Sequence, residues 1–196
     1  MQDVMDLQTA TIHEHDGVVV NYLGDGLLAM WNAPSEQPDH AQLACNAVLE
    51  IMRRMPALNE KWNSLLSRPL VLAAGINTGE ALVGNTGSQV KFSYGPMGSA
   101  VNLASRIEGA TQQLGVKILL SESTHELLNE SYPCRRLCRA SLSGIATPVN
   151  LYELSTESLT TEWQQRRDAF ETALDHFTAS RWTEACLALY PLISES

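Results

Sequence analysis

A Gly-Asp-Gly tripeptide, Gly24 to Gly26, constrains the fold of this chain more than any other feature. It stands between two short apolar runs, 17–23 and 27–31, which are partly β-branched. Glycine permits the positive φ angles of a tight turn, and aspartate is common in such turns. The pattern predicts a β-hairpin with Asp25 at its tip.

Strand and helix patterns alternate after this hairpin. Residues 39–66 repeat apolar side chains at steps of three and four, which predicts a long helix, kinked or split at Pro56. A short apolar run over 70–77 predicts a central strand, and 80–84 are expected to pair back against it. Ser99 is expected to be the N-cap of a helix that ends at Leu114. These elements interleave within one domain, residues 1–154.

Charge and composition narrow the classes of function. The 196 residues include 13 Lys+Arg and 22 Asp+Glu, which gives a formal net charge of −9. Nucleic-acid binders and polybasic membrane binders need a basic face, so we expect neither kind of partner. No apolar run approaches ~18 residues, so we expect no membrane span. The N-terminus does not resemble a signal peptide, and the four cysteines are expected to be free thiols in the cytoplasm.

A polar linker, residues 155–160, precedes a C-terminal segment of different character. Two amphipathic helices are expected within 161–196, with apolar side chains at Phe170 and Leu174 in the first and at Trp182 and Leu189 in the second. Such a hairpin resembles half of a tetratricopeptide-type repeat array, and one pair of helices alone cannot form a stable solenoid. The hairpin either packs on the main domain or begins a longer repeat region, and it is a candidate site for a protein partner.

Asp25 and two residues of the helix expected at 99–114 carry the candidate chemistry. Asn102 and Arg106 are four residues apart and share one helix face, roughly opposite the apolar stripe. Arginine offers a fixed fork of donors that suits phosphate oxygens, and asparagine both donates and accepts. With a carboxylate on a turn, this set suits a Mg²⁺-dependent phosphoryl site. An ordinary turn aspartate and a solvated helix face would give the same local patterns, so the site depends on the whole set of motifs.

Several stretches, in order and at family spacing, resemble the catalytic domain of class III adenylate and guanylate cyclases. The similarity covers about residues 5–154. No single motif is decisive, but the ordered set is highly specific. The stretches are Tyr22–Met30, Trp31–Pro34 with Asp39–Ala41, Gly75–Glu80, Val83–Ser88, Ala100–Glu108, Leu114–Ser121 and Pro148–Leu154.

The resemblance implies a ferredoxin-like nucleotide cyclase fold of the α/β (α+β) class, with an antiparallel sheet and flanking helices. It implies a head-to-tail homodimer with active sites at the interface. There, two Mg²⁺ or Mn²⁺ ions would bind a nucleoside triphosphate, ATP in preference to GTP, for conversion to a 3′,5′-cyclic nucleotide and pyrophosphate. Asp25 matches a metal aspartate, Asn102 the asparagine that orients the ribose, and Arg106 the arginine that stabilises charge at the α-phosphate.

Departures from the family pattern leave an alternative open. The family's first metal aspartate lies on a strand before the first helix, and this sequence begins within that helix. We therefore expect that strand to be missing and this chain alone to show little or no turnover. Asn21 stands where many members have a purine-reading lysine, and Gly95 where its partner Asp or Thr is usual, so both are candidate substrate-binding positions. The alternative is a degenerate homologue that binds nucleotide, or acts as a regulatory or dimerising module, without turnover.

Overall fold

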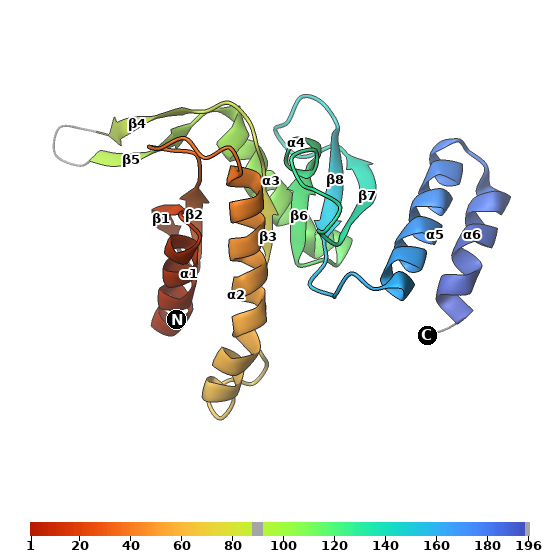
Figure 1. The fold of residues 1–196 in the computed structure, drawn as a ribbon, viewed down its shortest axis with the longest axis horizontal. Helices are drawn as coiled ribbons and strands as arrows, with labels where there is room; N and C mark the ends of the chain where they lie inside the picture. Colours follow the sequence, from red (N-terminus) through yellow and green to blue (C-terminus); the bar gives the residue numbers. More distant parts are fainter. Residues whose placement is uncertain (88–91, 195–196) are drawn as a thin grey trace.

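The computed structural model describes residues 1–87 and 92–194, and Figure 1 shows how their helices and strands are arranged. No helix among them is both long and apolar enough to cross a membrane. The elements, in chain order, are α1 (Gln2–Glu14), β1 (Val18–Leu23), β2 (Gly26–Met30), α2 (His40–Trp62), β3 (Ala74–Ile76), β4 (Leu82–Gly87), β5 (Phe92–Met97), α3 (Ser99–Leu114), β6 (Ile118–Ser121), α4 (Glu122–His125), β7 (Cys134–Ala140), β8 (Val149–Leu154), α5 (Thr161–Thr178) and α6 (Trp182–Ser194).

A four-stranded sheet in the order β3-β6-β8-β7 forms the centre of the fold. β3 and β6 run parallel, whereas β8 is antiparallel to both β6 and β7. The predicted α+β class is confirmed, with a mixed sheet in place of the antiparallel one. A parallel pair requires a long crossover connection, and α3 is part of the segment that returns the chain from β3 to β6.

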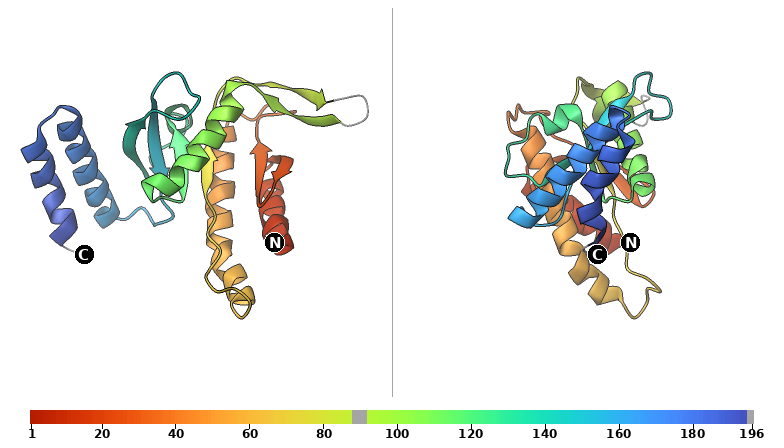
Figure 2. Two further views of the ribbon diagram at one scale, coloured as in Figure 1. Left: turned by 180° about the vertical axis from the view of Figure 1, so that it is seen from behind. Right: turned by 90° about the vertical axis from the view of Figure 1, so that its right-hand side faces the viewer.

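Strand β6 supplies core residues to both faces of this sheet. Ile118 and Leu120 pack with Cys45 of α2, whereas Leu119 packs with Ile107 of α3. Successive side chains of a strand point to opposite faces, so one short strand serves two cores. The sheet is thereby covered by α2 on one face and by α3 on the other (Figure 2).

Helix α2 also holds α1 in place. Met55 and Leu58, two residues of its predicted apolar stripe, are buried in a cluster with Val4 of α1. Pro56 does not split the helix, because α2 runs from His40 to Trp62 with Pro56 inside it. A proline removes one backbone hydrogen bond, and tertiary packing of the apolar stripe keeps the remaining turns helical.

The strand expected over 70–77 is much shorter than predicted. Only Ala74–Ile76 pairs, with β6, and it lies at the edge of the sheet rather than at its centre. Residues 80–84 do not pair back on it. Instead β4 pairs with β5 and forms an arm that projects from the body (Figure 1). An apolar run indicates burial but not the partner strand, so the predicted pairing was wrong.

Helices α5 and α6 lie beyond the other edge of the sheet, next to β7 (Figure 1). The backbone N–H of Arg136 donates to Glu171 Oε1 at 2.7 Å. The guanidinium of Arg135 lies 4.9 Å from the ring centroid of Phe170. An edge strand presents unpaired N–H groups, and α5 satisfies one of them on β7.

Candidate active site

The β1–β2 hairpin presents Asp25 at its turn. Leu23 pairs with Gly26, so the loop consists of two residues, Gly24 and Asp25. The φ of Gly24 is +68°, in the left-handed region that two-residue hairpin turns require. Asp25 is exposed and forms no hydrogen bond or ion pair with the described part of the chain. The predicted hairpin is confirmed, and its carboxylate is available to an external cation.

A bulge in β1 brings Asn21 and Gly95 into one neighbourhood. The register with β2 shifts between Val19 and Asn21, which leaves Val20 without a partner on β2. Val20 covers Gly95 of β5, where an added Cβ would lie 2.4 Å from Val20 Cγ1. Gly95 is buried and Asn21 is exposed. Close packing of β5 on β1 explains why position 95 is a glycine. Of Asn21 and Gly95, only Asn21 has a side chain that can contact a ligand.

Asn102 and Arg106 lie on the exposed face of α3. The opposite face inserts Ile107 into the core shared with β6 and β8. The N-cap is Gly98 rather than the predicted Ser99, because its φ of +130° is a conformation that favours glycine. Across residues 1–87 and 92–194, neither Asn102 nor Arg106 has a hydrogen-bond or ion-pair partner. Both side chains are free to contact a ligand or a second subunit.

Close backbone contact with β3 fixes the position of α3. A Cβ on Gly75 would lie 2.2 Å from Glu108 N and 2.6 Å from Ala104 O. At the first turn of the helix, Asn77 Nδ2 donates to the Ala100 carbonyl at 2.9 Å. No role was predicted for Gly75 or Asn77 individually. A glycine inside an apolar strand is the signal that indicates such an approach.

The described residues offer one candidate metal ligand rather than a complete metal site. Within them, no group of three or more His, Cys, Asp or Glu side chains is arranged to hold an ion. Asp25 fits as one ligand, because Mg²⁺ and Mn²⁺ prefer carboxylate oxygens. A pair of ions needs further carboxylates. Asp25 lies on the β1–β2 turn and the polar pair on α3, and no hydrogen bond or ion pair among the described residues joins Asp25 to either of them.

Two hollows on the described surface lie away from the candidate residues. One, of about 590 Å³, is lined by residues 65–71 after α2. The other, of about 380 Å³, is lined by residues near the start of β1 and by the segment 33–37. Neither has Asp25, Asn102 or Arg106 in its wall. Small ligands are usually bound in concave sites, and neither of these two hollows adjoins the candidate residues.

Comparisons with known proteins agree with this arrangement of elements. The family model described as the adenylate and guanylate cyclase catalytic domain matches residues 2–156. Adenylate cyclase 1 of Rhizobium meliloti (strain 1021) is 32% identical over 154 residues, which are 79% of this chain and 23% of that protein. Adenylate cyclase of Anabaena cylindrica is 25% identical over 161 residues, 79% of this chain and 31% of that protein. The chain thus spans less than a third of the length of these curated relatives.

Solved structures are similar over most of the chain. The adenylyl cyclase CyaB from P. aeruginosa superposes with a TM-score of 0.74 and 26% identity, covering 81% of each chain. The guanylyl cyclase Cya2 superposes with a TM-score of 0.67 and 28% identity, covering 81% of this chain and 82% of that chain. The family match runs from α1 to β8 and so includes the hairpin, the central sheet and α3; the chain belongs to the adenylate and guanylate cyclase catalytic domain family.

Proposed function

We propose that this chain is the catalytic part of a nucleotide cyclase that converts a nucleoside triphosphate to a 3′,5′-cyclic nucleotide and pyrophosphate in intracellular signalling. One observation carries the proposal: Asp25, Asn102 and Arg106, which match the family's motif residues, are all exposed and without partners in the described fold. ATP is the preferred substrate, since both curated relatives above are named as adenylate cyclases.

Each of the three side chains has a role that its chemistry supports. The planar guanidinium of Arg106 donates paired hydrogen bonds to α-phosphate oxygens and stabilises the charge that develops there. Asn102 both donates and accepts, which suits the ribose hydroxyls. Asp25 is an acceptor and would hold Mg²⁺ or Mn²⁺. A cation bound there would lower the pKa of the 3′-hydroxyl and would place positive charge beside the triphosphate.

Two copies of the chain would complete the site. Asp25 and the α3 pair stand on separate elements, and a head-to-tail dimer would face the hairpin of one copy toward α3 of the other. The β4–β5 arm, which projects from the body (Figure 2), exposes 72% of Leu82 and 40% of Tyr94. Apolar side chains exposed together on a projecting arm suit a contact between subunits.

The two-metal mechanism also needs a second carboxylate. Among the described strands, β2 pairs only with β1 and β3 pairs only with β6, so each keeps a free edge. A further strand that carries an aspartate would pair with such an edge and bring the second ligand into the sheet. Without it, Asp25 alone cannot hold two ions, and we expect residues 1–196 to show little or no turnover.

A second candidate function is a cyclase homologue that binds nucleotide or forms regulatory dimers without turnover. Gly95 favours it, because this position lies under Val20 and has no side chain to read a purine. Asn21 offers an amide where many family members have a lysine. A hydrogen-bonding site discriminates among bases only through the groups that are present.

An assay of cyclic nucleotide and pyrophosphate release from ATP or GTP, with Mg²⁺ or Mn²⁺, distinguishes the two candidate functions. We expect no product from residues 1–196, product from a chain extended by a strand that carries the second metal-binding aspartate, and loss of that activity in Asp25→Ala and Arg106→Ala. Gln113→Ala, at an exposed position further along α3, is the matched control and should retain activity. Near-normal activity in either variant would contradict the assigned roles. An extended chain that binds nucleotide but stays inactive would favour the second candidate.

A further inference from the structure

Every second residue from Gly75 to Gly79 lies against helix α3. A Cβ on Gly75 would lie 2.6 Å from Ala104 O, and a Cβ on Gly79 would lie 3.2 Å from Ala100 Cβ. Asn77, between the two glycines, is the one of the three with a side chain, and its Nδ2 donates to the Ala100 carbonyl at 2.9 Å. The glycines allow a close approach, whereas Asn77 makes a directional contact with the helix.

The residues of α3 that meet this segment bear a fixed relation to the two candidate catalytic residues. Asn102 follows Ala100 by two positions, and Arg106 follows Ala104 by two. Two residues of a helix turn ~200° about its axis, so a side chain two positions further on points to the opposite side. Asn102 and Arg106 are accordingly exposed. A rotation of α3 about its axis would therefore move both side chains together.

Apolar packing constrains the beginning of α3 less than the rest of the helix. The fully buried side chains of α3 begin at Ile107, and residues 99–106 are half-buried or exposed. Asn102 and Arg106 both belong to this less buried part. A hydrogen bond weakens steeply as it departs from its preferred direction, so the bond from Asn77 opposes a rotation that loose packing would allow.

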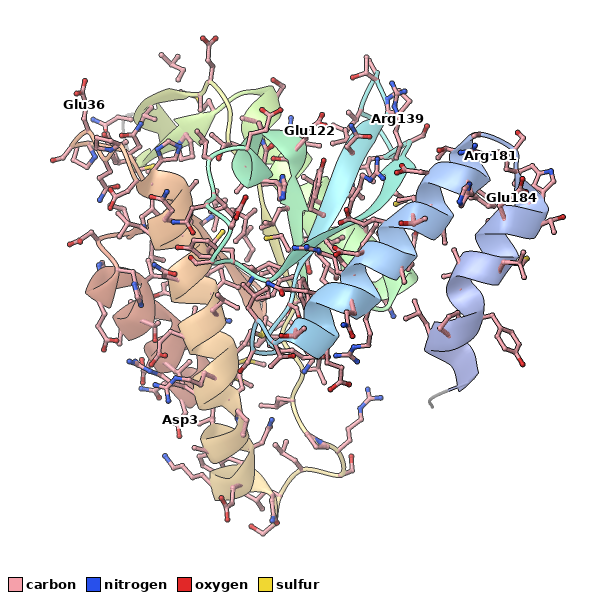
Figure 3. The ribbon with its side chains drawn as sticks, turned by 45° about the vertical axis from the view of Figure 1, so that its right-hand side comes forward. Asp3, Glu36, Glu122, Arg139, Arg181 and Glu184 are labelled. Atoms are coloured by element: carbon pink, nitrogen blue, oxygen red, sulfur yellow. The ribbon has the colours of Figure 1, made fainter. Side chains whose placement is uncertain are left out.

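Helix α4 fixes the backbone next to Asn77. It begins at Glu122, directly after β6, and so lies at the carboxyl ends of the parallel strands β3 and β6 (Figure 3). Ser123 Oγ donates to Thr78 O at 2.6 Å, and Thr124 Oγ1 donates to Thr78 Oγ1 at 3.1 Å. Thr124 is fully buried, and satisfied buried networks of this kind are rigid. The side chain of Asn77 is thereby held in place for its bond to α3.

We propose that Asn77 is a positioning residue for the cyclase reaction: its amide sets the rotation of α3 and thereby the directions of Asn102 and Arg106. This inference rests on the proposed function. Asn77 acts through the helix and does not itself touch the substrate. A displacement of about 1 Å at the reacting groups can cost roughly 100-fold in rate. Because Arg106 acts on charge that develops in the transition state, the loss should appear in kcat more than in KM.

The acceptor half of the same amide distinguishes this role from a contribution to stability. Asn77 Oδ1 is buried and has no hydrogen-bond partner among the described residues. Leucine branches at the same atom, so Asn77→Leu removes the donor and the unpaired acceptor together. An unpaired buried acceptor costs at least as much as one neutral hydrogen bond contributes, so Asn77→Leu should lower Tm by less than ~2 °C.

Asn59→Leu is the matched control, because the same substitution there removes bonds of the same kind. Asn59 Nδ2 donates to Leu70 O at 3.0 Å, and Asn59 Oδ1 accepts from Leu70 N at 2.8 Å, near the carboxyl end of α2. In the chain extended by the aspartate-bearing strand, Asn77→Leu should lower kcat at least about tenfold and change KM less than about threefold. Asn59→Leu leaves a backbone N–H and a carbonyl unpaired, so it should lower Tm more than Asn77→Leu and leave kcat unchanged.

Amide hydrogen exchange in residues 1–196 tests the link between Asn77 and α3 without catalysis. Asn77→Leu should speed exchange of the 103–106 amides at least about threefold, because the first turns open more often, and Asn59→Leu should leave these amides unchanged. Two results would overturn the proposal: equal exchange in Asn77→Leu and the unmodified chain, or a kcat loss no larger than that of Asn59→Leu. An inactive extended chain in which Asn77→Leu still speeds exchange would instead refute the proposed function, while the link from Asn77 to α3 would stand.

Discussion

Alanine at Gly75 tests whether direct backbone contact sets the position of α3. The added Cβ would lie 2.2 Å from Glu108 N, 2.6 Å from Ala104 O and 2.7 Å from Glu108 Cα. Ordinary contact begins at 3.4 Å, and all three atoms belong to the backbone of α3. No side-chain rotation relieves the overlap, so the whole helix must move away from β3 by about 1 Å.

Such a displacement loosens the core that α3 shares with the sheet. Ile107, Leu119 and Leu151 meet there, and each has 0% of its surface exposed. Overpacking a close-packed site costs about 1–3 kcal/mol, and a clash with backbone belongs at the upper end. For a chain of this length each kcal/mol shifts Tm by ~2–4 °C, so we expect Gly75→Ala to lower Tm by about 6–12 °C.

Thermal unfolding followed by circular dichroism measures this shift, and Gly109 on the same helix provides the control. A Cβ there meets no heavy atom within 4 Å, so Gly109→Ala adds only helix propensity. It should stabilise the fold by about 0.5–1 kcal/mol and raise Tm by ~1–4 °C. The two substitutions are chemically identical and should act in opposite directions. A Gly75→Ala variant as stable as the unmodified chain would refute the argument from close contact.

Three further predictions concern other parts of the fold. Gly95→Ala overlaps Val20 Cγ1 and should lower Tm by ~2–6 °C, and Val20→Ala in the same chain should restore part of the loss in a double-mutant cycle. Asp25→Ala should leave Tm within about 1 °C by thermal unfolding, because exposed side chains without partners contribute little to stability. Hydrogen bonds from Arg53 and Arg54 lower the pKa of Glu50 from 4.5 to about 2, so its stabilisation is present above pH 4.5 and is lost as pH falls toward 2. The urea midpoint of Glu50→Gln should therefore fall less over this window than that of the unmodified chain.

The elements that the sequence predicts correctly are determined by residues that lie close together in the chain. The turn at Gly24 and Asp25 needs a residue that accepts positive φ, and the chain places a glycine there. Helix α3 is predicted to its last residue, and Gly115 follows with a φ of +68° that ends the helix in the left-handed conformation. Neither feature depends on which distant strand lies nearby.

The pairing of strands was not predicted, because it depends on contacts between distant segments. The run over 70–77 is as apolar as a central strand, yet three of its residues pair, at the edge of the sheet. The interior strands are β6 and β8, and each contributes buried side chains to both core clusters. Apolar character alone does not distinguish an edge strand covered by a helix from a central one.

For the candidate site, the sequence identifies residue types but not the geometry between them. Asn102 and Arg106 share a face because four residues complete about one turn of a helix, which is a local relation. The relation of this pair to Asp25 is not local, because Asp25 lies on the β1–β2 turn and the pair on α3. The close contact of Gly95 with Val20 depends on the bulge in β1, which no pattern in the sequence indicates.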